Sequence, residues 1–164
     1  MIILVSDTSI LIDLERGGLL EAAFSCGLTM VVPDLLYDRE LAAENGPFLR
    51  QLGLGVVALT PDELELAQQV QAERKGLSLP DCFALCCALR PDHALVTGDR
   101  ILRTEALSRQ AKVFGLLWFL DQMASSGVIA MSMLFEGLSR IATHPRCRLP
   151  QAEVRQRLAT WRSE

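Results

Sequence analysis

The chain has 164 residues, of which 50% are hydrophobic and 22% charged, a balance that excludes a disordered protein and allows one sizeable core. No apolar run approaches the roughly 20 residues that span a bilayer, so a membrane protein is also excluded. The first residues lack a basic stretch and already include Asp7 and Asp13, unlike a secretory signal peptide. We therefore expect a cytoplasmic protein without membrane contact.

The five cysteines are an odd number and lack the spacing of a disulfide framework. Neither of the two histidines stands at zinc-ligand spacing from the cysteines of segment 82–87. We expect reduced thiols that pack as small core residues.

The net charge of −4 is unevenly distributed along the chain. Segment 140–164 carries six arginines and only two glutamates, whereas the rest of the chain is acidic. A basic C-terminal piece could face a polyanion or an acidic partner, or could be an ordinary solvated helix face. The sequence leaves these interpretations open.

Short aliphatic segments alternate with longer amphipathic ones along the chain. Strands are predicted at 2–6, 29–32, 56–59, 94–96 and 113–114. Helices are predicted at 10–14, 19–24, 34–43, 61–75, 79–90, 101–110, 116–124, 131–142 and 151–161. This alternation is typical of a parallel sheet covered by helices. We expect an α/β fold, a three-layer α/β/α sandwich with a mostly parallel sheet, plus a C-terminal helical extension.

Four acidic residues follow or accompany these elements. Asp7 comes directly after the first strand, and Asp99 ends the segment that contains the fourth. Because ligands bind beyond the carboxyl ends of parallel strands, we expect these carboxylates to meet there, joined by Glu40 and Asp81 from helices. Four negative charges in one pocket need protons or cations to neutralise them. Carboxylate oxygens favour hard ions such as Mg²⁺ or Mn²⁺, which indicates a metal-dependent enzyme that acts on a phosphate ester.

The same blocks carry a family resemblance. They are Val5-Ser6-Asp7-Thr8-Ser9, Val32-Pro33 with Glu40-Leu41, Leu79-Pro80-Asp81 with Ala84 and Ala88, and Leu95-Val96-Thr97-Gly98-Asp99. In this order and spacing the sequence resembles the PIN-domain family of metal-dependent nucleases, which includes the VapC-like toxins of toxin–antitoxin pairs. The resemblance implies a PIN-like nuclease domain over 1–128. Residues 129–164 would then be a helical extension, packed on this domain or extending it.

The resemblance also implies an activity and partners. A PIN-like nuclease would bind one or two Mg²⁺ or Mn²⁺ ions and cleave RNA, and as a toxin it would form a homodimer and bind a small antitoxin protein. Asp7, Glu40, Asp81 and Asp99 match the family's acidic positions, and Ser9 matches a small hydroxyl residue. Some members carry a further acid where this chain has Ile101. The second ion would therefore be held more weakly, or only with substrate.

The chemistry of phosphodiester hydrolysis assigns roles to these residues. Metal ions neutralise the phosphate and supply hydroxide at neutral pH, and no histidine or cysteine is placed as a nucleophile. We expect Asp7 to be the central ligand, Asp81 and Asp99 to ligate directly or through water, and Glu40 to ligate or to orient the water. Substrate contacts are expected from Ser9, Thr97, Arg100 and Arg103.

Other interpretations compete with this one. Taken singly, Asp7, Asp81 and Asp99 suit helix N-termini, and Glu40 could be surface charge. A non-cleaving PIN-like scaffold that binds RNA or protein stays open because of Ile101. A haloacid dehalogenase-type phosphatase is disfavoured because Ser9 stands where its second aspartate belongs. A receiver-like domain is dropped because strand 56–59 does not end in an aspartate.

Overall fold

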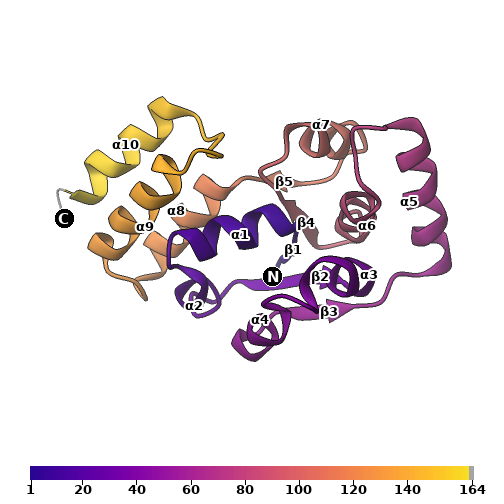
Figure 1. The fold of residues 1–164 in the computed structure, drawn as a ribbon, viewed down its shortest axis with the longest axis horizontal. Helices are drawn as coiled ribbons and strands as arrows, with labels where there is room; N and C mark the ends of the chain where they lie inside the picture. The colour runs from indigo at the N-terminus through magenta and orange to yellow at the C-terminus, as the bar shows by residue number, and fades with distance from the viewer. Residues whose placement is uncertain (163–164) are drawn as a thin grey trace.

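The computed structural model describes residues 1–162, which fold around a five-stranded sheet. The sheet has the order β3-β2-β1-β4-β5 (Figure 1), and every adjacent pair is parallel. The strands are β1 (Ile3–Ser6), β2 (Thr29–Pro33), β3 (Gly55–Val57), β4 (His93–Val96) and β5 (Val113–Phe114). All five predicted strands are present, and the predicted α/β fold with a parallel sheet is confirmed.

Helices connect the strands and flank the sheet. They are α1 (Thr8–Arg16), α2 (Leu20–Ala23), α3 (Asp34–Leu36), the π-helix η1 (Tyr37–Leu41), α4 (Gly46–Leu52), α5 (Pro61–Glu73), α6 (Leu79–Ala88), α7 (Arg100–Ser108), α8 (Leu116–Ser126), α9 (Met131–Thr143) and α10 (Gln151–Arg162). Helix α6 packs against β1, β2 and β4, and α5 packs on α6. None of the helices within residues 1–162 is long and apolar enough to cross a membrane.

The segment between β2 and β3 differs from the sequence prediction. The helix expected over 34–43 is a short α-helix that continues as the π-helix η1, and the following helix α4 was not predicted. Gly46 explains how the two helices join, because a Cβ there would lie 2.5 Å from the backbone oxygen of Leu41 and 2.8 Å from the Tyr37 ring. Only glycine permits this approach. Isolated π-helical turns are frequent at functional sites, and this one carries Glu40.

Helix α5 has a well-defined start and end. Thr60 and Glu63 form a capping box at the start of α5, in which the Glu63 N–H donates to Thr60 Oγ1 over 3.1 Å and the Thr60 N–H donates to Glu63 Oε1 over 2.8 Å. Helix α5 ends at Glu73, two residues earlier than predicted, because Arg74 adopts φ −121° and ψ 87°. The extended backbone at Arg74 cannot continue a helix.

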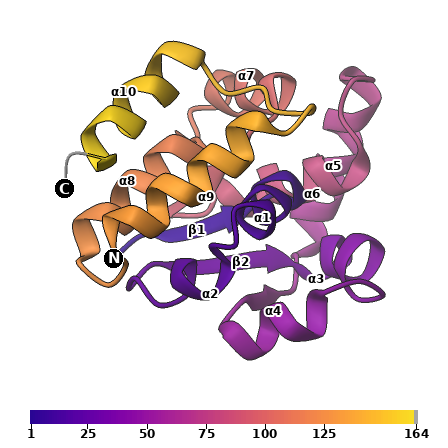
Figure 2. The same ribbon diagram turned by 60° about the vertical axis from the view of Figure 1, so that its left-hand side comes forward.

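The C-terminal helices α9 and α10 pack on the rest of the molecule. Helix α9 lies against α1 and α8, and α10 lies against α9 (Figures 1 and 2). Gly137 of α9 allows a close approach, because a Cβ there would lie 2.6 Å from Leu19 Cδ1. The segment 144–150 between these helices is thereby held beside α1. The domain boundary at residue 128 stays a prediction.

The cysteines of α6 lie in the core beneath the sheet. Cys82, Cys86 and Cys87 are buried, and all are free thiols. Burial raises the pKa of Cys86 to about 12 and those of Cys82 and Cys87 to about 11. These thiols are protonated at neutral pH, which fits the expected packing role and makes them poor nucleophiles.

Candidate active site

Asp7 lies at the carboxyl end of the central strand β1 with only 2% of its surface exposed. Its Oδ1 caps α1 by accepting from the Ile10 N–H over 3.1 Å, and it also accepts from Ser9 Oγ over 2.7 Å. Its Oδ2 accepts a hydrogen bond from the Thr97 hydroxyl. Asp7 is therefore a helix cap, as the competing interpretation proposed, and it is also the centre of a polar network.

The charge on Asp7 has no cationic partner among residues 1–162. Burial raises the pKa of Asp7 to about 6, although the hydroxyls of Thr97 and Ser9 and the Ile10 N–H oppose this change. The negative charge of Asp81 raises it further, and no lysine or arginine in this range forms an ion pair with Asp7. A carboxylate in this state favours a proton or a bound cation.

The ends of β1 and β4 are linked by hydroxyl groups. The strands pair in register, with Ser6 opposite Val96. Thr97 Oγ1 donates to Asp7 and accepts from the Asp99 N–H over 2.9 Å, and the Gly98 N–H donates to Ser9 Oγ over 3.4 Å. Asp99 in turn caps α7 by accepting from the Leu102 N–H over 2.9 Å. The two predicted strand-end aspartates thus belong to one network.

Glu40 and Asp81 reach the same region from helices. Glu40 is exposed on η1 and accepts a 2.7 Å hydrogen bond from Thr8, the residue that follows Asp7. Asp81 forms a capping box at the start of α6, accepting from the Ser78 N–H over 3.1 Å and donating from its own N–H to Ser78 Oγ over 3.2 Å. Asp81 also raises the pKa of Asp7, so the two acids are close enough to interact.

The predicted arginines lie along α7. Arg100 lines a surface hollow with Arg74, Ile101 and Thr104, and the Arg103 guanidinium lies so close to Gly115 that a Cβ there would meet its Nη2 at 2.6 Å. Neither guanidinium forms a hydrogen bond or an ion pair with Asp7 or Asp99 within residues 1–162, and their role in binding phosphate stays a prediction. Ile101 is half exposed, and its Cδ1 would lie 3.0 Å from a Cβ on Gly76.

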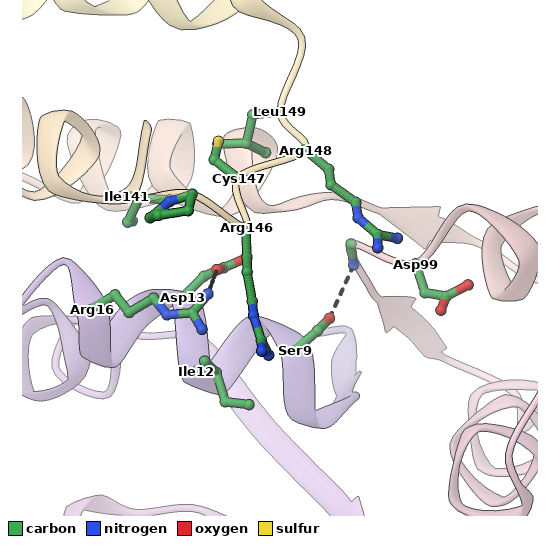
Figure 3. Close-up of a pocket in the computed structure, with 12 residues that line it drawn as sticks. Ser9, Ile12, Asp13, Arg16, Asp99, Ile141, Arg146, Cys147, Arg148 and Leu149 are labelled. Carbon is green, nitrogen blue, oxygen red and sulfur yellow. Dashed lines mark hydrogen bonds and ion pairs between the residues drawn. The ribbon is translucent and has the colours of Figure 1, made fainter. Parts of the chain in front are cut away.

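A cavity of about 520 Å³ adjoins the acidic network. Its lining comes from α1, from the turn between β4 and α7 and from segment 144–150 (Figure 3), and includes Ser9, Asp99, Arg16, Arg146 and Arg148. None of these three arginines was expected at the site from the sequence. For Arg146 and Arg148 the basic composition of segment 140–164 was a signal, but it did not show which arginines face the site, and Arg16 lies outside that segment.

A comparison with known protein families identifies the family of this chain. The model of the family DUF3368, described as a PIN domain, matches residues 3–163. The chain belongs to the PIN domain family. The match spans both the sheet-containing part and the C-terminal helices of this PIN domain. A comparison with curated proteins finds no match.

The oxygen donors of this PIN domain suit the hard divalent ions that the family generally uses. Three of the acids each accept hydrogen bonds through one carboxylate oxygen only. The oxygens that accept none within residues 1–162 are Glu40 Oε2, Asp81 Oδ1 and Asp99 Oδ2. In the present side-chain positions, no three His, Cys, Asp or Glu residues of that range form a set that could hold a metal ion. The chemistry of these carboxylate and hydroxyl oxygens nevertheless fits a hard divalent ion.

Proposed function

We propose that the protein is a divalent-metal-dependent endoribonuclease that hydrolyses RNA phosphodiester bonds. The observation that carries this proposal is Asp7, a buried carboxylate at the carboxyl end of β1 that two hydroxyls orient and that no cation within residues 1–162 neutralises. Ligands of parallel α/β folds bind at this edge of the sheet. Membership of the PIN domain family, typically one of metal-dependent nucleases, supports the same chemistry.

Asp7, Glu40, Asp81 and Asp99 would hold one or two Mg²⁺ or Mn²⁺ ions. When bound, such ions neutralise phosphate charge and lower the pKa of a bound water. Ser9 and Thr97 hold the two Asp7 oxygens in fixed positions, and Thr8 holds Glu40 near them. These contacts orient the carboxylates before substrate arrives, so less reorganisation is needed during reaction.

We also propose a biological role for this nuclease. As the resemblance to VapC-like proteins suggests, the nuclease would be the toxin of a toxin–antitoxin pair, with a small antitoxin protein covering the acidic site and a homodimer as the functional form. Expression of the chain in a bacterial host with and without an adjacent small gene tests this role. Growth arrest that the small gene relieves is expected, and unaffected growth in both cases would contradict it.

Cleavage of RNA by the purified protein tests the enzymatic proposal. We expect cleavage in Mg²⁺ or Mn²⁺ that is lost with EDTA and in Asp7→Asn. Asp92→Asn is the matched control, because Asp92 precedes β4 at the opposite edge of the sheet and its φ of 60° is one that asparagine tolerates. Cleavage that survives Asp7→Asn would refute the assignment of this site.

A second function, RNA or protein binding without cleavage, is favoured by one observation. Asp81 and Asp99 each use one carboxylate oxygen to cap a helix N-terminus, and no complete set of metal ligands forms within residues 1–162. The cleavage assay separates the two functions when RNA binding is measured beside it. A scaffold would bind RNA equally well with and without EDTA and would leave the RNA intact.

A further inference from the structure

We propose that the cavity between α1, the β4–α7 turn and segment 144–150 binds a phosphate of the RNA backbone beside the scissile bond, through Arg146 and Arg148. This inference rests on the proposed function and deepens it. It gives the C-terminal helices a role in the reaction, because the segment that joins them supplies the cationic side chains.

The cavity is continuous with the acidic network. Ser9, Gly98 and Asp99 belong to both, since the Gly98 N–H donates to Ser9 Oγ and Ser9 donates to Asp7. A chain of nucleotides with one phosphate at the acids would therefore place a neighbouring part of its backbone in the cavity. The volume of about 520 Å³ is large enough for a small organic group.

Arg146 and Arg148 are available for a ligand. Both are exposed, and neither guanidinium forms a hydrogen bond or an ion pair within residues 1–162, whereas Arg16 pairs with Asp13 at 3.6 Å. Figure 3 shows Arg146 extending toward α1 and Arg148 extending toward the β4–α7 turn. Guanidinium groups match phosphate oxygens with two parallel hydrogen bonds.

The backbone of the segment is held in a turn. The Arg146 N–H donates to His144 Nδ1 over 3.1 Å, and the Cys147 N–H donates to the His144 carbonyl over 3.0 Å. The turn places two arginines on one short connection above α1. Binding there would not require this segment to order first, which lowers the entropic cost of binding.

Charge explains why the arginines are needed at this place. The carboxylates of the acidic network repel RNA phosphates, and Arg100 and Arg103 do not line the cavity. Of the charged groups that do line it, Asp13 is neutralised by Arg16, which leaves Arg146 and Arg148 against Asp99. RNA is favoured over an acidic polypeptide because the cavity shares Ser9 and Asp99 with the acidic network.

Binding of a fluorescent single-stranded oligoribonucleotide tests the proposal. The Asp7→Asn protein is titrated in EDTA at several salt concentrations, alone and combined with Arg146→Ala/Arg148→Ala. We expect the arginine variant to bind about tenfold more weakly or worse. The plot of log affinity against log salt has a negative slope, and its magnitude should decrease by roughly 0.7 for each lost phosphate contact.

Two matched variants control the experiment. Arg140→Ala/Arg155→Ala removes the same charge from the same part of the chain, at exposed side chains that do not line the cavity, and should bind nearly as the parent does. Arg146→Lys/Arg148→Lys keeps the charge and should retain the salt slope while recovering part of the affinity. Melting temperatures confirm that all variants are folded.

The outcomes separate this site from the nuclease proposal. Equal losses in both alanine pairs would show non-specific charge and would overturn the site, as would undetectable RNA binding by the parent. A wild-type protein that binds RNA through these arginines but never cleaves would overturn the nuclease proposal alone. The same titration is made with a polyglutamate peptide. If the Arg146→Ala/Arg148→Ala variant binds the peptide more weakly but binds RNA as the parent does, the cavity serves an acidic polypeptide and our inference is wrong.

Discussion

The Thr97 hydroxyl at the end of β4 donates a hydrogen bond to the Asp7 carboxylate at the end of β1. Both side chains are buried, and 90 residues of chain separate them. The same hydroxyl accepts from the Asp99 N–H. A single oxygen thus fixes two of the proposed metal-binding acids relative to one another, and the parallel register of β1 and β4 is what makes this contact form.

Thr97→Val tests the importance of that contact. The substitution keeps the shape of the side chain but leaves the buried Asp7 Oδ2 and the Asp99 N–H without a partner. We expect the free energy of unfolding at pH 7 to fall by about 1–3 kcal/mol, and the pKa of Asp7 to rise. Urea denaturation measures the stability. Thr29→Val, at an exposed position, is the control, and equal effects of the two substitutions would contradict the argument.

Asp7→Asn should change how the stability of the metal-free protein depends on pH. Because burial raises the pKa of Asp7 from 3.8 to about 6, the folded state holds a proton that the unfolded state releases between these values. The wild-type protein therefore loses stability as pH rises from 3.8 to about 6, by roughly 3 kcal/mol at most. The variant lacks this loss.

Denaturant titrations at about pH 4, 5, 6 and 7, which span the Asp7 transition, would measure the effect. The stability of Asp7→Asn relative to wild type should increase over this interval and level off above it. A difference that does not vary with pH would show that Asp7 is not buried as an unpaired carboxyl group.

Glu63 gives the opposite pH dependence. Hydrogen bonds from Arg90, at 2.8 Å to each carboxylate oxygen, lower the pKa of Glu63 from 4.5 to about 2, against the effect of burial. The stabilisation from this pair is complete above pH 4.5 and is lost as pH falls toward about 2. Glu63→Gln should be less stable than wild type at pH 7, and the difference should shrink in acid. Thermal melts of both proteins at pH 7 and in acid measure this difference in stability.

Gly137→Ala tests the packing of the C-terminal helices. The added methyl group would lie 2.6 Å from Leu19 Cδ1, which is fully buried. Overpacking of this kind costs about 1–3 kcal/mol, although alanine is the better helix former. We expect a lower melting temperature, with Ser132→Ala on the exposed face of α9 as the control. An unchanged melting temperature would show that α9 is not held tightly against Leu19.

Parts of this architecture could be predicted from the sequence because they depend on local patterns. Short aliphatic runs identified the five strands, and the parallel topology then placed Asp7 and Asp99 at the same edge. The π-helix η1 could not be foreseen, since no local pattern marks its hydrogen bond from the Ala42 N–H to the Tyr37 carbonyl or the close approach of Gly46 to Leu41. It decides how Glu40 approaches Thr8.

The cavity depended on tertiary packing in the same way. Arg146 and Arg148 face the acidic network only because α9 packs closely on α1, where a Cβ on Gly17 would lie 2.9 Å from Ile141 Cδ1. No local pattern encodes a contact between residues so far apart. Thr97 was selected because it stands two residues before Asp99 at a strand end that the sequence reveals, but its hydrogen bond to Asp7 was not predicted.

Calorimetric titration with Mn²⁺ tests the central claim most directly, because it asks whether the acids at the carboxyl edge of the sheet bind a divalent cation. We expect saturable binding to wild type and Asp92→Asn, and loss of binding in Asp7→Asn. Equal binding by all three proteins, or none by wild type, would contradict it.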